Sequence, residues 1–152
     1  MAETIAIASD HAAYELKAAL ADELREAGHT VIDLGTNGGA SVDYPDFGYR
    51  IGHAIASGAA RFGVALCGSG IGISIAANRN PAVRCALVSD VLAARLAREH
   101  NDANVIAMGA RLIGAEQARA CLAAFLETSF AGGRHQGRVD KLTHPEIQEH
   151  RA

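Results

Sequence analysis

Short apolar runs alternate with helix-like segments five times along the chain, and this alternation restricts the fold more than any other feature. The apolar runs are residues 4–9, 30–34, 63–67, 84–88 and 104–107. Each precedes a stretch of helical character, and in residues 12–27 leucines recur every four positions. The pattern predicts an α/β fold: a doubly wound, five-stranded parallel sheet of the Rossmann-like or flavodoxin-like kind, with helices on both faces.

Further helices are expected over residues 45–60, 73–78, 90–100 and 115–126. We expect residues 1–152 to form one domain. Residues 132–152 are too few for a second domain and are predicted to be a C-terminal extension that packs at a subunit interface. Open parallel sheets bind ligands at the carboxyl ends of their strands. That rule selects residues 10–11, the loop after residue 34, and residues 67–72, 89–90 and 108–111.

Composition excludes several classes of protein. With 49% hydrophobic and 20% charged residues, the chain is too apolar to be disordered. A net charge of −3 and 5% aromatic residues argue against a nucleic-acid partner. No apolar run reaches the roughly 18 residues of a membrane span, so we expect no membrane partner.

The three cysteines are Cys67, Cys85 and Cys121, and they form no C-x-x-C pair. An odd, widely spaced set predicts reduced thiols and a cytoplasmic location. Cys85 and Cys121 are expected in the core. No pair of histidines or carboxylates has the spacing of metal ligands, so we expect no metal and no cofactor.

A glycine-rich loop, Cys67-Gly68-Ser69-Gly70-Ile71-Gly72, joins the third apolar run to the next helix. Alternate glycines let backbone N–H groups point into one concavity, and the following helix adds the positive end of its dipole. The loop therefore suits an anion, either a phosphate or the oxygen of a transient enediolate. A tight turn that only packs helix on strand is the alternative.

Polar residues accompany this loop at other element ends. Cys67, beside a helix N-terminus, is a candidate nucleophile or proton-transferring base; a small buried hydrophobe is the alternative. Asp10 and His11 close the first run, where an N-cap and a packed ring are the alternatives. His100 and Asn101 close the fourth helix, with Asn101 expected to be its left-handed cap.

Arg134 and Arg138 lie four residues apart in the C-terminal extension. If this stretch is helical, both side chains face the same way and form a two-pronged clamp for a phosphate. A solvated basic surface is the alternative.

These residues together resemble type B ribose-5-phosphate isomerase, of the family shared with the subunits of galactose-6-phosphate isomerase. The likeness extends from residue 5 to about residue 142. Its anchors are Ser9-Asp10-His11-Ala12, Asp43-Tyr44-Pro45, residues 67–78, residues 98–104 and Gly133-Arg134-His135-Gln136-x-Arg138. The family interconverts an aldose phosphate and its ketose without a metal.

The resemblance implies a role for each matching residue. Cys67 is the base that shuttles a proton between C1 and C2, and His100 is the acid that helps open the furanose ring, with Asp10 opposite. The enediolate receives N–H groups from Gly68, Ser69, Gly70, Ile71 and Gly72. Asn101 binds substrate, and the phosphate ligands are His11, Arg111, Arg134 and Arg138. Ile73 stands where one subgroup has a catalytic glutamate, so the chain is of the cysteine type.

The family forms dimers or tetramers of dimers whose sites straddle two chains. The resemblance therefore implies that His100 and the C-terminal arginines enter the other subunit's site. The expected reaction interconverts ribose 5-phosphate and ribulose 5-phosphate through a cis-enediolate, a step of the pentose phosphate pathway.

Two alternatives stay open. One is an isomerase of a tetrose 4-phosphate, allose 6-phosphate or galactose 6-phosphate, because the small uncharged loop 37–41 leaves the length of the sugar undecided. The other is a non-catalytic module that binds a phosphorylated ligand. Cys67, His100 and Asp10 favour an enzyme, because a pure binder needs neither a base nor a ring-opening acid.

Overall fold

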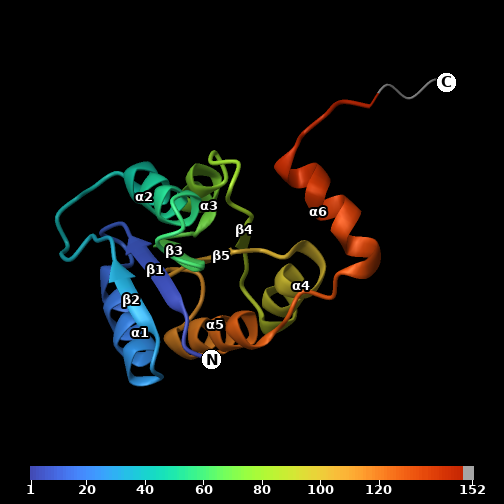
Figure 1. Ribbon diagram of the computed structural model, residues 1–152. Coiled ribbons are helices and arrows are strands. Elements are labelled where there is room, and N and C mark those ends of the chain that lie inside the picture. Colours follow the sequence, from blue (N-terminus) through green and yellow to red (C-terminus); the bar gives the residue numbers. More distant parts are fainter. Residues whose placement is uncertain (149–152) are drawn as a thin grey trace.

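The structure is a computed structural model that describes residues 1–148 (Figure 1). Its strands are β1 (Thr4–Ser9), β2 (Thr30–Asp33), β3 (Phe62–Cys67), β4 (Cys85–Leu87) and β5 (Val105–Gly109). Its helices are α1 (Tyr14–Glu26), α2 (Tyr44–Ala56), α3 (Ile71–Ala77), α4 (Val91–Asn101), α5 (Ala115–Glu127), the 3₁₀ turn η1 (Gly133–His135) and α6 (Gln136–Thr143).

The strands form one parallel sheet in the order β2-β1-β3-β5-β4, which confirms the predicted α/β fold. The connections leave β1 toward β2 and then return past it to β3. This reversal lies between β1 and β3, so the carboxyl ends of these two strands flank the topological switch point.

The two faces of the sheet bury residues of different size. Ile5, Ile7 and Val64 point to the face covered by α1, α4 and α5. The alternate positions, Ala6 and Ala8 among them, point to the face covered by α2 and α3. Because side chains alternate along a strand, one sequence run supplies a large-residue face and a small-residue face.

The small-residue face lets α2 and α3 approach each other closely. A Cβ on Gly48 of α2 would lie 2.6 Å from the Cβ of Ala76 and 2.9 Å from the carbonyl oxygen of Ile73, both in α3. Glycine at this position therefore sets the place of α3, the helix that follows the glycine loop.

Several predicted boundaries were wrong. Helix α2 ends at Ala56 and not near residue 60, because Gly58 turns the chain with φ of 74°. Helix α3 begins at Ile71, inside the glycine motif. Cys85, expected in mid-strand and in the core, is the first residue of β4 and is only half-buried.

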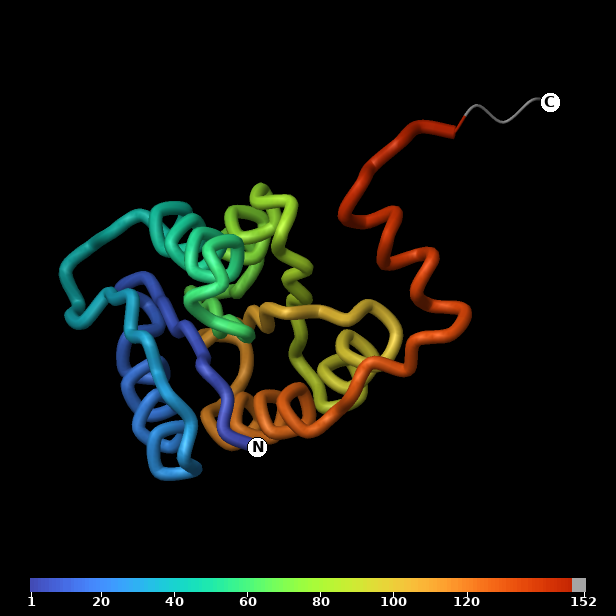
Figure 2. Tube along the Cα trace, in the orientation of Figure 1, coloured from blue at the N-terminus to red at the C-terminus, as the bar shows by residue number. Residues whose placement is uncertain are grey.

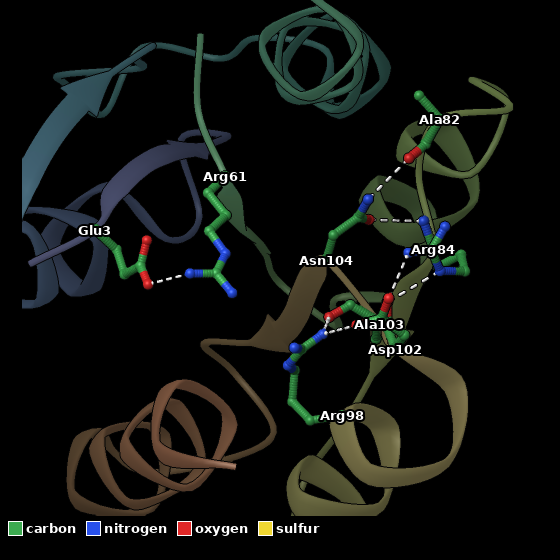
Figure 3. A network of polar contacts seen from close by, with 8 residues as sticks. All are labelled: Glu3, Arg61, Ala82, Arg84, Arg98, Asp102, Ala103 and Asn104. Carbon is green, nitrogen blue, oxygen red and sulfur yellow. Dashed lines mark hydrogen bonds and ion pairs between the residues drawn. The ribbon is translucent and has the colours of Figure 1, made fainter. Parts of the chain in front are cut away.

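The cap of α4 is Asp102, with φ of 45°, and not Asn101 (Figure 3). Its carboxylate accepts hydrogen bonds from Arg98 at 2.8 Å and Arg84 at 3.3 Å, and its carbonyl oxygen accepts one from Arg84 Nε at 2.9 Å. These bonds hold a left-handed aspartate in place. They attach the C-terminal end of α4 to the start of β4.

The segment after α5 crosses the end of α4 and then turns away from the sheet as η1 and α6 (Figures 1 and 2). The N–H of Ala131 donates to the carbonyl oxygen of Glu99 at 3.0 Å, which attaches the segment to α4. Leu142 of α6 is 56% exposed. Residues 149–152, the end of the predicted extension, lie outside the described residues. No helix within residues 1–148 is long and apolar enough to span a membrane.

We predict that Gly48→Ala lowers the free energy of unfolding by about 1–3 kcal/mol, because the added methyl group overpacks the contact between α2 and α3. Urea denaturation measures the change. Gly38→Ala is the matched control, since a Cβ there has no neighbour within 4 Å, and its effect should stay within about 0.5 kcal/mol. Equal stability of the two variants would contradict this account of the α2–α3 contact.

Candidate active site

A cavity of about 550 Å³ opens at the carboxyl ends of β1 and β3, where the topology predicts a ligand site. Its polar lining comes from Asp10, Tyr44, Cys67, Ser69 and Arg111, with Gly68 and Gly72 between them. Its apolar lining comes from Ile71, Ile75 and Leu112. The volume suits a small metabolite.

Cys67 is the last residue of β3, and its side chain is 4% exposed. The N–H of Gly70 donates a hydrogen bond to Cys67 Sγ at 3.1 Å. Helix α3 begins one residue later, so the sulfur lies beside both a backbone donor and a helix N-terminus. A thiolate at a cavity wall can accept a proton from a bound molecule.

The other cysteines lie outside this cavity. Burial raises the pKa of Cys85 to about 12, which keeps its thiol protonated. Burial, followed by the charge of Asp90, also raises the pKa of Cys121, which is fully buried in α5. Of the three cysteines, Cys67 is the one that lines the cavity.

The glycine loop presents backbone donors to the cavity. Among residues 1–148, the N–H groups of Gly68, Ser69 and Gly72 have no hydrogen-bond acceptor. All three residues line the cavity. Unpaired N–H groups beside a helix N-terminus form a site for an oxyanion.

Tyr44, the first residue of α2, covers one side of the loop. A Cβ on Gly72 would lie 2.4 Å from Cε2 of the Tyr44 ring, so glycine is required for this contact. No role for Tyr44, Ile75 or Leu112 is predicted from the sequence. The signal for Tyr44 was available: a helix that follows a strand begins at the same sheet edge as the strand's carboxyl end.

Asp10 and His11 follow β1 and differ in their surroundings. Asp10 is 6% exposed, and its Oδ1 accepts the N–H of Ala12 at 3.0 Å, so it caps a turn and not helix α1. His11 Nδ1 accepts the N–H of Val42 at 3.2 Å. An accepting Nδ1 leaves the proton of the neutral ring on Nε2, which makes that atom a donor. His11 does not itself line the cavity.

Arg111 supplies positive charge at the cavity wall. The backbone N–H of Arg111 donates a hydrogen bond to the carbonyl oxygen of Gly68 at 2.9 Å. A Cβ on Gly68 would lie 3.4 Å from Arg111 Cδ, so the side chain crosses the loop in close contact. A guanidinium at this position can bind a phosphate or a carboxylate.

Four predicted site residues lie away from this cavity: His100, Asn101, Arg134 and Arg138. Helix α4 runs antiparallel to the strands, so its last residues lie at the amino ends of the strands. Cys67 lies at the carboxyl ends, on the other side of the sheet. Eleven residues at a rise of about 1.5 Å each make the helix roughly 16 Å long. Arg134 and Arg138 are exposed, in η1 and α6.

The residues described here include no group of three His, Cys, Asp or Glu side chains placed to hold a metal ion. The chemistry available at the cavity comes from the sulfur of Cys67, the carboxyl group of Asp10, the guanidinium of Arg111 and a set of N–H donors. Together they can abstract a proton and stabilise the oxyanion that results.

Comparisons with known proteins agree with this arrangement. Residues 5–142 match the model of the family described as Ribose/Galactose Isomerase. The chain is 41% identical to ribose-5-phosphate isomerase B of Escherichia coli, over 91% of this chain and 93% of that one. It is 42% identical to D-erythrulose-4-phosphate isomerase of Pectobacterium atrosepticum, over 96% and 97% of the two chains.

A solved structure shares the fold closely. The ribose-5-phosphate isomerase B of Clostridium thermocellum superposes with a TM-score of 0.91 at 47% sequence identity, over 92% of this chain and 95% of that chain. The family match at residues 5–142 extends from β1 into α6. This chain belongs to the ribose/galactose isomerase family.

Proposed function

We propose that this protein is a metal-independent aldose–ketose isomerase that interconverts ribose 5-phosphate and ribulose 5-phosphate. The observation that supports this most directly is the buried Cys67 sulfur, which lies among N–H donors on the wall of the cavity. A base beside an oxyanion site is what the transfer of a proton between neighbouring carbons requires.

In the proposed mechanism, the Cys67 thiolate removes the proton from C2 of the open-chain aldose. The C2–H electron pair forms the C1–C2 double bond of a cis-enediolate, and the carbonyl oxygen O1 takes the negative charge. The free N–H groups of Gly68, Ser69 and Gly72 stabilise this charge. The N–H groups of Gly70 and Ile71 reach the enediolate only by exchanging their present acceptors, Cys67 Sγ and Ser69 Oγ. Return of the proton from sulfur to C1, and of the O2 proton to O1, gives the ketose.

The phosphate holds the sugar at the far end from the reacting carbons. Arg111 and the Nε2 donor of His11 belong to the same chain as Cys67, and Arg134 and Arg138 complete the phosphate site from a second chain. Remote binding of this kind fixes the reacting atoms and lowers the entropic cost of the reaction. Asp10 assists ring opening opposite His100, and Asn101 contacts the substrate.

The direction of the crossover helices supports a homodimer with shared sites. His100 ends a helix at the amino edge of the sheet, so it serves a neighbour's Cys67 more readily than its own. The rim of the cavity favours such contact, because Ile71, Ile75 and Leu112 are 51%, 58% and 68% exposed there. The described part of the C-terminal extension, residues 132–148, packs at this interface, and two dimers can associate into a tetramer.

The cell compartment and pathway belong to the same proposal. Reduced cysteines suit the cytoplasm, and the reaction places the enzyme in the pentose phosphate pathway. The 42% identity to a D-erythrulose-4-phosphate isomerase favours a second candidate, a tetrose phosphate isomerase on the same site.

A substrate panel tests the function. We expect turnover of ribose 5-phosphate with kcat/KM above that for erythrose 4-phosphate, allose 6-phosphate and galactose 6-phosphate, before and after dialysis against EDTA. A higher value for erythrose 4-phosphate would favour the second candidate. Turnover of none of the four would support a binding module. Loss on dialysis that one divalent ion restores would contradict metal independence.

Cys67→Ala should lower kcat by about 10²–10⁴-fold, because it removes the general base. Inhibition by inorganic phosphate should persist, since the phosphate ligands are unchanged. Cys85→Ala is the control; its thiol stays protonated and lies outside the cavity, so kcat should be retained. A near-normal kcat for Cys67→Ala would refute its role.

Arg138→Ala should lower kcat/KM by about one to two decades, since a lost charge-assisted hydrogen bond costs roughly 1.5–3 kcal/mol. Mixed Cys67→Ala and Arg134→Ala/Arg138→Ala chains should regain activity, because one of the two sites in the heterodimer then has every group. Absence of rescue in a verified heterodimer, or full activity in a proven monomer, would exclude a shared site.

A further inference from the structure

The rings of His100 and His135 are stacked, with centroids 4.4 Å apart and planes inclined by 13°. His100 lies in α4, and His135 ends the 3₁₀ turn η1 that leads into α6. His135 is buried, although its neighbours Arg134 and Gln136 are exposed. This burial shows that η1 packs its histidine onto α4 and leaves the arginines outside.

The stack is one of the contacts that join the C-terminal segment to α4. The hydrogen bond from Ala131 to Glu99 is another, four residues earlier in the chain. The end of α4 is itself fixed, because Asp102 is held by Arg84 and Arg98 (Figure 3). His135 therefore connects the fixed end of α4 to the segment that carries Arg134 and Arg138.

We propose that His135 is a positioning residue. By stacking on His100 it fixes the orientation of that imidazole and links it to the phosphate-binding arginines. The proposal rests on the proposed function, in which His100 and these arginines enter a neighbour's site together. The segment that carries the phosphate-binding arginines then also holds the ring-opening acid of α4 in position.

The charges around His135 support this role. Its pKa is lowered, first by burial and then by the charges of His100 on α4 and of Arg134 and Arg138 on its own segment; Glu99 on α4 opposes them. A lowered pKa keeps His135 neutral near pH 7, so it offers His100 a flat, uncharged partner. A phosphate dianion between the arginines would offset two of these charges.

Two substitutions at one position separate stacking from other roles. His135→Ala removes the ring, whereas His135→Phe keeps a flat ring that neither titrates nor donates. Ring-current shifts of the His100 ring protons, measured by NMR at pH 8, report the stack directly. His144→Ala is the matched control, because His144 is an exposed histidine at the end of α6.

We expect His135→Ala to lose the ring-current shift and to lower kcat for ribose 5-phosphate about tenfold, with KM and the inhibition constant of inorganic phosphate within about twofold. His135→Phe should restore the shift and most of kcat, and His144→Ala should change neither. An unchanged His100 signal in His135→Ala, a kcat in His135→Phe as low as in His135→Ala, or a weakened phosphate inhibition with normal kcat would each overturn the proposal.

The NMR measurement needs no turnover. If the unmodified protein isomerises no sugar phosphate, the proposed function fails, and the His100 signals still decide whether His135 orients that ring. If His135→Ala does not fold, His135→Phe alone decides between a stacked and an unstacked His100.

Discussion

The candidate active site depends on one contact between two stretches of backbone. Gly109, the last residue of β5, lies so close to the glycine loop that a Cβ there would be 2.5 Å from the carbonyl carbon and oxygen of Ser69. Gly70, at φ of 76°, lies against the carbonyl carbon of Met108 in the same way. With no side chain between them, the loop rests on the sheet edge, and its N–H groups stay beside Cys67. A larger residue at either glycine would push these donors away from the sulfur.

Small residues also cover much of the sheet face that packs against α2 and α3. Alanines on that face leave room for two helices that touch through Gly48, and α2 in turn places Tyr44 over Gly72. The opposite face is filled with isoleucine, leucine and phenylalanine, including the edge-to-face pair of Phe62 and Phe125 at 5.7 Å. Large side chains bury the most apolar area. Stability thus comes chiefly from one face, and precise placement of the site comes from the other.

Features that depend on residues close together in the sequence could be predicted from it. Alternating strands and helices gave the sheet, and the strand-end rule selected Asp10, Cys67, the glycine loop and Arg111, all of which line or adjoin one cavity. Prediction from the sequence failed where a feature depends on contacts between residues far apart in the chain. Asp102 is the cap of α4 because Arg84, 18 residues earlier, binds its carboxylate; Tyr44 joins the cavity because Gly72 admits its ring. The His100–His135 stack joins residues that no periodicity connects.

The direction of a crossover helix is the reason why the proposed mechanism uses two chains. In a parallel sheet, every strand ends on the same side of the sheet, at the carboxyl ends of the strands. Every connecting helix runs back and ends on the opposite side, at the amino ends of the strands. Cys67 is the last residue of β3, and His100 lies in the last turn of α4. The fold of one chain therefore keeps them at opposite ends of the strands. The proposed mechanism uses both residues, and it therefore needs a second chain whose α4 end faces the cavity. In that proposal, the exposed apolar rim of Ile71, Ile75 and Leu112 is the surface that the second chain covers.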